Sequence, residues 1–173
     1  EKKGGVLERL LKLRDGKVKA LLPFGFPLTL GNDLSGTVRS VGMQVRRFQA
    51  GDRIIARLGK SRIGAFAQRA LVAQDDAAFA PAKLDLIDAA ALPLAGLTAW
   101  QALFEMGQLQ AGQTILIHAG AGGVGHFALQ LARWKGARVI TTAGAKNRER
   151  CLALGADEVI DYRSTRFDQL VHD

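Results

Sequence analysis

The sequence predicts an α/β protein in which part of a small β-barrel precedes the first half of a doubly wound parallel sheet. Two observations lead to this fold class. Between about residues 27 and 80 the apolar segments are short and separated by glycines, which is typical of small antiparallel β-structures. After Gly112, compact apolar strands alternate with amphipathic helices, which is the pattern of parallel βαβ units.

The first part is predicted to consist of strands followed by two helices. We expect strands over residues 35–41, 53–56, 65–72 and 77–80. An alanine-rich helix is expected over residues 85–92, ending at Pro93, and a second helix over 94–106 has apolar residues at helical spacing. Gly107 can end that helix. We place the domain boundary between these two helices, giving domains of residues 1–92 and 93–173.

The second part is predicted to run strand, helix, strand, helix, strand, which is one mononucleotide-binding half of a Rossmann domain. The strands are expected over residues 114–118, 138–142 and 158–161. The helices are expected over residues 123–135 and 147–154, with Asn147 as the N-cap of the second helix and Gly155 at its end. Residues 165–168 resemble a capping box that opens a further helix.

Composition limits the classes of protein that the chain can belong to. It has 173 residues, of which 48% are hydrophobic, and one cysteine, Cys151, so that neither an internal disulfide nor a four-cysteine zinc site can form. The longest apolar run, residues 89–100, is too short and too interrupted to span a membrane. No signal peptide is visible, and we expect a cytoplasmic protein with no membrane partner.

The positive charge is concentrated in the first part of the chain. The net charge is +8; residues 1–70 hold 15 Lys and Arg against 5 Asp and Glu, whereas residues 71–173 hold 9 against 11. Such asymmetry can mark a nucleic-acid-binding face, but no nucleic-acid motif or interleaved aromatic residues accompany it. We therefore favour a solvated basic surface that also attracts anionic ligands, and keep nucleic-acid binding as an alternative.

A glycine-rich turn is predicted between the first strand and the first helix of the second part. Its sequence, Gly-Ala-Gly-Gly-Val-Gly over residues 120–125, fits the pattern G-x-G-x-x-G in the required context. We expect Gly120 to permit a tight turn, Gly122 to let a pyrophosphate approach the backbone, and Gly125 to let the helix pack on the strand. The helix start then offers N–H groups to phosphates. The predicted contacts with a dinucleotide come from Gly120, Gly122, Gly123, Val124 and Gly125.

The end of the second predicted strand favours NADPH over NADH. NAD sites usually place a carboxylate there for the ribose 2′-hydroxyl, but residues 141–148 contain none. Lys146 and Arg148 lie in this stretch instead and can pair with a 2′-phosphate. The alternative is that both are ordinary solvated charges near a helix start.

A series of motifs in a fixed order resembles one family. The segments that carry the resemblance are residues 31–36, 51–53, 64–67, 91–94, 96–100, 118–125 and 154–163. Together they resemble the quinone oxidoreductase branch of the medium-chain dehydrogenase/reductase superfamily, from about Lys12 to the last residue. The resemblance implies a partial GroES-like domain followed by part of a Rossmann domain.

The resemblance also implies an activity and further site residues. It implies NADPH-dependent reduction of a quinone or an α,β-unsaturated carbonyl. Gly144, Lys146 and Tyr162 match residues around the 2′-phosphate in that branch, and Thr98 matches a threonine near the cofactor. From the residues alone, Thr98 is a helix residue and Tyr162 a strand-end aromatic residue.

No catalytic metal is expected. Zinc-dependent relatives carry Gly-His-Glu where this chain has Gly31-Asn32-Asp33, and Asn32 is a poor zinc ligand. The histidines at 118, 126 and 172 are scattered and are interpreted as structural. Hydride transfer to a quinone or enone is feasible without a metal, with Asn32 either contacting the substrate carbonyl or holding a loop. Cys151 falls inside a predicted helix and is interpreted as a packing residue.

Compared with the family, the chain is expected to lack the opening strands of the first domain and the last three Rossmann strands. A half-sheet exposes an edge and an apolar face, so we predict a homodimer that covers them, with a partial copy of a longer enzyme as the alternative. Three alternatives remain open: an enoyl reductase acting on thioesters, a dinucleotide-binding protein without catalysis, and a nucleic-acid-binding protein.

Overall fold

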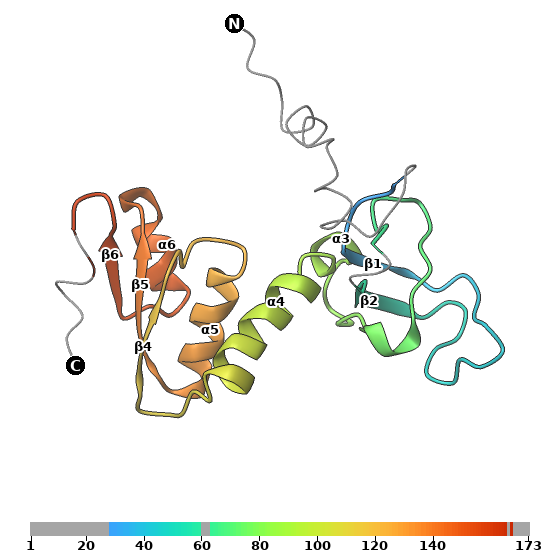
Figure 1. Ribbon diagram of the computed structural model, residues 1–173, viewed down its shortest axis with the longest axis horizontal. Helices are drawn as coiled ribbons and strands as arrows, with labels where there is room; N and C mark the ends of the chain where they lie inside the picture. The colour runs from blue at the N-terminus through green and yellow to red at the C-terminus, as the bar shows by residue number, and fades with distance from the viewer. Residues whose placement is uncertain (1–27, 60–62, 166, 168–173) are drawn as a thin grey trace, which may run out of the picture. The chain divides into compact units, whose positions relative to one another are not determined.

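The computed structural model describes residues 28–59, 63–165 and 167, and shows the chain as two compact units. The first unit ends at Phe79 and the second begins at Ala80. Figure 1 shows both units along the chain, and each is described here by itself. The domain boundary predicted after residue 92 stays a prediction. Within the described residues, no helix has the length and apolar character needed to cross a membrane.

The first unit is built on a three-stranded antiparallel sheet. Its strands are β1 (Asp33–Thr37), β2 (Arg53–Arg57) and β3 (Ala77–Phe79), in the order β1-β2-β3. In the register, Ser35 pairs with Ile55, and Ile55 pairs with Ala78. Alternate residues of β2 are buried, as expected for a sheet with one covered face. A short 3₁₀ turn, η1 (Gln74–Asp76), leads into β3.

The strand predicted over residues 65–72 is wrong, and the strand predicted over 35–41 is shorter than expected. Residues 65–72 form no strand in the structure, and their backbone turns toward residues 30 and 31 instead. The Ala65 N–H donates to the Gly31 carbonyl at 3.1 Å, and the Phe66 N–H donates to Leu30 at 2.8 Å. Apolar composition suggested a half-buried strand, but Phe66 is 78% exposed, so the segment has no buried face to fix a register.

The second unit begins with two helices close to those predicted. Helix α3 (Leu86–Ala89) is capped by Asp85, whose carboxylate accepts the Ile87 N–H at 2.7 Å. Helix α4 (Pro93–Trp100) starts at a proline, which is suited to the first turn. It continues as a π-helix, η2 (Gln101–Met106), so the single α-helix predicted over 94–106 widens in its second half. The π-helix ends at Gly107, as predicted, and the Gly107 N–H donates to the Ala102 carbonyl.

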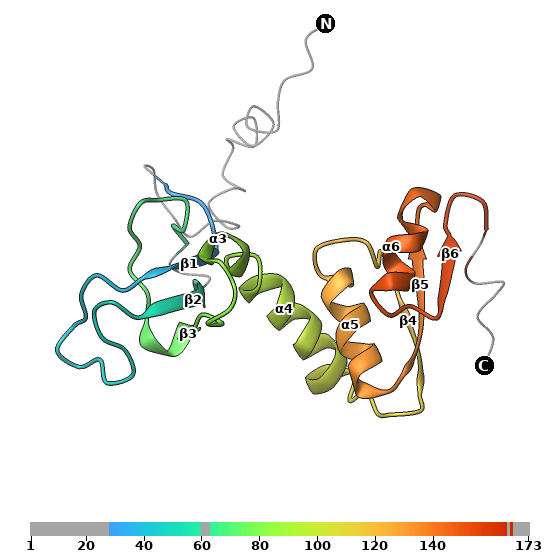
Figure 2. The ribbon, with the colours of Figure 1, turned by 180° about the vertical axis from the view of Figure 1, so that it is seen from behind.

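The second unit then forms a parallel sheet through two successive βαβ units. The elements are β4 (Thr114–Ile117), α5 (Gly125–Lys135), β5 (Arg138–Ala143), η3 (Ala145–Asn147), α6 (Arg148–Ala153) and β6 (Glu158–Asp161). The strand order is β4-β5-β6, and both pairings are parallel. Figure 2 shows the same elements from behind. The strict alternation predicted from the sequence is confirmed, with element ends shifted by one or two residues.

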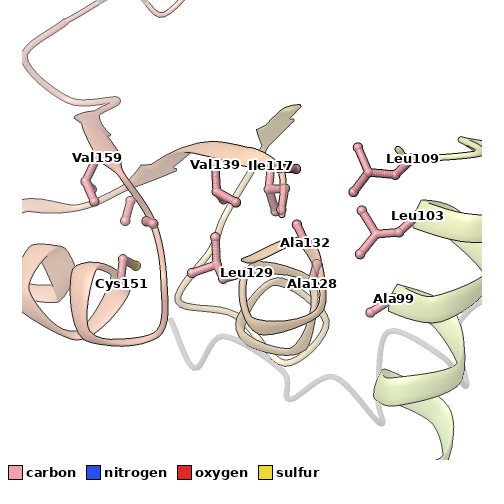
Figure 3. Close-up of a cluster of buried hydrophobic side chains, with 13 residues drawn as sticks. Ala99, Leu103, Leu109, Ile117, Ala128, Leu129, Ala132, Val139, Cys151 and Val159 are labelled. Atoms are coloured by element: carbon pink, nitrogen blue, oxygen red, sulfur yellow. The ribbon is translucent and has the colours of Figure 1, made fainter. Parts of the chain in front are cut away.

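The core of the second unit lies between this sheet and its helices. Figure 3 shows Ile117, Val139 and Val159 pointing from the three strands toward α5 and α6, with α4 beside α5. Leu129 of α5 and Cys151 of α6 are fully buried against them. Periodicity predicted a buried face of α5 at residues 124, 127, 128, 131 and 132. Ala128 and Ala132 are buried as predicted, whereas Val124 is 40% exposed and the fully buried Leu129 was not predicted. Burial of Cys151 confirms that it is a packing residue.

The ends of α5 and α6 depend on glycines in left-handed backbone conformations. Gly136 (φ 85°) follows α5, and Gly155 (φ 108°) follows α6, as predicted for Gly155. Asn147 occupies the N-cap position of α6, but its side chain makes no capping hydrogen bond because η3 precedes the helix. The capping box predicted over 165–168 lies partly outside the described residues.

Replacing Gly155 by alanine should destabilise the fold. The left-handed conformation costs a residue with a side chain about 1–2 kcal/mol. A Cβ there would also lie 2.9 Å from the Cβ of Arg133. Urea unfolding should show that Gly155→Ala lowers the free energy of unfolding by at least about 1–2 kcal/mol. The control is Gly96→Ala in α4, where a Cβ meets nothing within 4 Å and alanine favours the helix by up to about 1 kcal/mol. Equal stability of the two variants would contradict the prediction.

Cys151 should react slowly with iodoacetamide in the folded chain. Burial raises the pKa of the Cys151 thiol, with a smaller opposing effect from Arg150. The native state therefore holds the proton to higher pH than the unfolded state. The protonated Cys151 thiol therefore contributes fully to the free energy of unfolding below the ordinary thiol pKa of about 8.5. This contribution is lost as pH rises through the raised pKa. Mass spectrometry should find slow labelling in buffer and fast labelling in urea; equal rates would exclude a buried thiol.

Candidate functional site

The glycine-rich turn lies at the carboxyl end of β4, and neighbouring atoms leave no room for a side chain at two of its glycines. A Cβ on Gly120 would overlap the Thr141 hydroxyl and lie 3.1 Å from the Thr141 Cβ. A Cβ on Gly125 would overlap the Ala119 carbonyl and lie 2.8 Å from the Gly120 Cα. The close approach predicted for Gly125 is therefore present. Gly120 must be glycine because Thr141 of β5 leaves no room for a side chain. A special backbone conformation is not the cause, since the φ of Gly120 is not in the left-handed region.

The other two glycines of the turn are less crowded. A Cβ on Gly122 would lie 3.1 Å from the Ala119 carbonyl oxygen, whereas a Cβ on Gly123 would meet no atom within 4 Å. Gly123 therefore has no steric reason to be glycine within the described part of the chain. Free space beside its backbone is what the close approach of a ligand requires.

The start of α5 presents free backbone donors. The helix ladder begins with the His126 N–H donating to the Gly122 carbonyl at 3.0 Å. Among the described residues, the N–H groups of Gly123, Val124 and Gly125 have no hydrogen-bond partner. The N-cap position, Val124, has no side chain that could satisfy them. Free N–H groups at the positive end of the dipole of an 11-residue helix form a site for an anion.

The remaining predicted cofactor residues follow β5 and β6 at the same edge of the sheet. Ala143 pairs with Asp161, so Gly144 and Tyr162, the next residues, leave the sheet side by side. The Tyr162 hydroxyl lies 3.9 Å from the position that a Gly144 Cβ would take. The structure thus brings Gly144 and Tyr162 together, at the edge where the glycine-rich turn follows β4.

The two predicted cations at this edge differ in their contacts. Lys146 lies in η3, is exposed, and has no ion-pair partner among the described residues. Arg148 donates from its guanidinium to the Val159 carbonyl at 2.7 Å, so part of its hydrogen-bonding capacity ties α6 to β6. Lys146 is therefore the freer of the two for an added anion.

The sequence prediction missed Arg163. Its guanidinium carbon lies 5.8 Å from the centroid of the Tyr162 ring, in cation–π contact. It adds a cation next to the Gly144–Tyr162 pair. Its place directly after Tyr162 in the sequence is a signal that could have identified it.

Thr98 and Asn32 are placed separately, in different units. Thr98 lies on α4, and its hydroxyl donates to the Leu94 carbonyl at 2.7 Å, which is the usual bond of a threonine inside a helix. Asn32 precedes β1 and is half-buried; its carbonyl accepts the Leu58 N–H at 2.7 Å. The roles of both residues stay predictions.

Two of the histidines make local contacts. The His118 Nδ1 lies 3.2 Å from the Thr142 hydroxyl, and the His126 Nδ1 lies 3.0 Å from the Gly122 carbonyl oxygen. His172 lies outside the described residues. Within residues 28–59, 63–165 and 167, no three His, Cys, Asp or Glu side chains gather as a metal site requires. The expected absence of a catalytic metal stays a prediction.

Comparison with known families gives two matches along the chain. Residues 4–82 match the alcohol dehydrogenase GroES-like domain, and residues 123–173 match the family described as zinc-binding dehydrogenase. The first match begins at residue 4, earlier than the position near Lys12 at which the resemblance was expected to start. The two matches confirm the predicted order of a GroES-like part followed by a Rossmann part.

Individual relatives cover most of this chain. A chloroplastic quinone-oxidoreductase homolog of Spinacia oleracea is 39% identical over 158 residues, covering 88% of this chain and 48% of the relative. The highly reducing polyketide synthase apmlA of Arthrinium phaeospermum is 38% identical over 151 residues, 84% of this chain and 6% of that protein. The chain thus spans about half the length of the quinone-oxidoreductase relative.

A solved structure agrees with these relatives. The Escherichia coli quinone oxidoreductase, solved in complex with NADPH, has a TM-score of 0.80 and 34% sequence identity, with 88% of this chain and 46% of that chain covered. The fold, the order of the motifs and these similarities lead to one conclusion. The chain belongs to the medium-chain dehydrogenase/reductase superfamily, in its quinone oxidoreductase branch.

Proposed function

We propose that the chain binds NADPH at the carboxyl edge of the β4-β5-β6 sheet and serves a metal-independent oxidoreductase that reduces quinones or α,β-unsaturated carbonyls. One observation carries the proposal. Three consecutive N–H groups at the start of α5 have no partner among the described residues, and they follow a glycine-rich turn that leaves space beside Gly123. A pyrophosphate supplies the oxygens that such groups require.

The chain's own residues would orient the dinucleotide along the sheet edge. The N–H groups of Gly123, Val124 and Gly125 would bind the pyrophosphate. The adenosine end would then extend over β5 toward Gly144 and Tyr162, since the carboxyl ends of parallel strands share one edge. When bound, the nicotinamide ring supplies the hydride, and the protein contributes orientation and a polar surrounding.

The preference for NADPH rests on the charges around η3. Residues 144–148, directly after β5, contain no carboxylate, and Lys146 is exposed with no ion-pair partner among the described residues. An ammonium group binds a 2′-phosphate by a charge-assisted hydrogen bond, whereas a ribose hydroxyl offers it much less. Arg148 and Arg163 add positive charge nearby, and Tyr162 fills the space beside Gly144.

Metal independence rests on the donor set in the first unit. Asn32 stands where zinc-dependent relatives have a histidine, and an amide is a weak ligand for zinc. A quinone or enone accepts a hydride at an electron-poor carbon, so the carbonyl oxygen needs only a hydrogen-bond donor. The Asn32 amide can provide that donor, because its side chain makes no hydrogen bond to another described residue.

A second candidate is an enoyl-thioester reductase. The similarity to a polyketide synthase, 38% identical over 151 residues, favours it. The two candidates share the cofactor and the hydride transfer, and differ in whether the unsaturated carbonyl is a free quinone or enone, or a thioester.

Calorimetric titration should show tighter binding of NADPH than of NADH, and Lys146→Glu should abolish the difference. A charge-assisted hydrogen bond contributes about 1.5–3 kcal/mol, so the preference should be roughly tenfold or more. The control is Lys135→Glu, at the other end of α5, roughly 15 Å along the helix axis from its start. This control should keep the preference. Equal affinities of the unmutated chain for the two nucleotides would refute the NADPH assignment.

Hydride transfer should be tested with a panel of acceptors. Oxidation of NADPH is followed by its absorbance with a benzoquinone, a simple enone and an enoyl thioester. Turnover with the benzoquinone or enone that persists in the presence of a chelator supports the first candidate, and turnover with the thioester alone supports the second. Binding without turnover would support the dinucleotide-binding alternative for these 173 residues.

A further inference from the structure

Thr142, near the end of β5, makes hydrogen bonds to three consecutive residues that lead into the glycine-rich turn. Its hydroxyl oxygen accepts the Ala119 N–H at 3.1 Å and lies 3.2 Å from the His118 Nδ1. Its backbone carbonyl accepts the Gly120 N–H at 3.1 Å. No other described residue is bonded to this turn at three successive positions.

The Thr142 hydroxyl can act both as an acceptor and as a donor in this arrangement. The oxygen accepts from Ala119, which leaves the hydroxyl proton free to be donated to the His118 Nδ1 when that nitrogen carries no proton. The residue is only 5% exposed, so water has little access to compete for these bonds. Valine has nearly the same shape but can make neither side-chain bond.

The Ala119 backbone is held in a conformation that alanine rarely adopts. Its φ is 53°, in the left-handed region, and this costs a residue with a side chain about 1–2 kcal/mol. Such a conformation persists only where surrounding bonds fix it. The bond from the Ala119 N–H to Thr142 is the side-chain contact that does so here.

Ala119 in turn is connected to the start of α5. Its carbonyl accepts the Gly122 N–H at 2.8 Å, and the Gly122 carbonyl accepts the His126 N–H at 3.0 Å. A continuous series of hydrogen bonds therefore runs from Thr142 through Ala119 and Gly122 to the first turn of the helix. The three free N–H groups lie within this segment, so their direction depends on the series.

We propose that Thr142 is a positioning residue, which fixes the His118–Gly120 segment so that the free N–H groups at the start of α5 converge on a pyrophosphate. This inference rests on the proposed function. It assigns to Thr142 a role in affinity for both nicotinamide dinucleotides, because the pyrophosphate is common to them, and none in the choice between them.

The test compares Thr142→Val with Thr142→Ser in the full chain. Thr142→Val loses the side-chain hydrogen bonds to Ala119 and His118, and loss of the Ala119 bond that holds the site should weaken binding of both NADPH and NADH by about two- to tenfold. Thr142→Ser keeps the hydroxyl and should bind as the unmutated chain does. Amide exchange measured by NMR without nucleotide should be faster at Ala119 in the valine variant alone. The matched control, Thr114→Val, lies at the exposed start of β4. It should change neither the nucleotide affinity nor the amide exchange at Ala119.

The outcomes separate this inference from the proposed function. If the unmutated, folded chain binds neither nucleotide, the proposed function is wrong, and amide exchange at Ala119 still tests whether Thr142 holds the His118–Gly120 segment. If the unmutated chain binds and Thr142→Val binds equally well, the positioning role is wrong. Should Thr142→Val fail to fold, Thr142→Ala takes its place; failure of both to fold while the serine variant folds would show a role in stability and overturn the proposal.

Discussion

The parallel pairing of β4 with β5 is the constraint on which the candidate site depends. Ile117 pairs with Thr141, and the chain leaves β4 at the next residue while still bonded to β5. The Thr141 hydroxyl donates to the Ile117 carbonyl at 2.6 Å, on the buried side of the strand. Thr141 and Thr142 therefore both bind the end of β4. Thr141 also excludes a side chain at Gly120. The glycine is required by its neighbour on the next strand.

A site built from backbone groups explains why so short a motif indicates function. Its candidate anion ligands are N–H groups that every residue except proline has, so side-chain identity matters only where a side chain would obstruct. Gly125 would collide with the Ala119 carbonyl if it had a Cβ, whereas Gly123 has open space. A glycine at 125 is needed for the helix to start where it does. A glycine at 123 instead leaves space for a ligand to approach. Steric analysis distinguishes the two kinds of glycine, which are equivalent in the sequence pattern.

The sequence was sufficient for features that depend on local periodicity. The βαβ alternation and the end of α6 at Gly155 follow from patterns within short stretches of the chain. Features that depend on residues far apart were missed. Thr142 contacts Ala119 across 23 positions, and the irregular segment at Ala65 bonds to Gly31. The strand predicted at residues 65–72 was wrong because apolar composition does not show whether other residues cover the segment.

The proposed cofactor preference shows how structure refines a charge pattern. Sequence treats Lys146 and Arg148 as equivalent cations, but the guanidinium of Arg148 donates to the Val159 carbonyl and secures α6 against β6. The nearby carboxylate of Asp161 accepts the Arg163 N–H at 3.0 Å, so it closes the turn after β6. Asp161 would repel a 2′-phosphate, whereas the guanidinium of Arg163, two residues further along the chain and in contact with the Tyr162 ring, adds a positive charge nearby. Under the proposed NADPH preference, discrimination between the nucleotides would therefore depend mainly on Lys146, which makes no ion pair among the described residues.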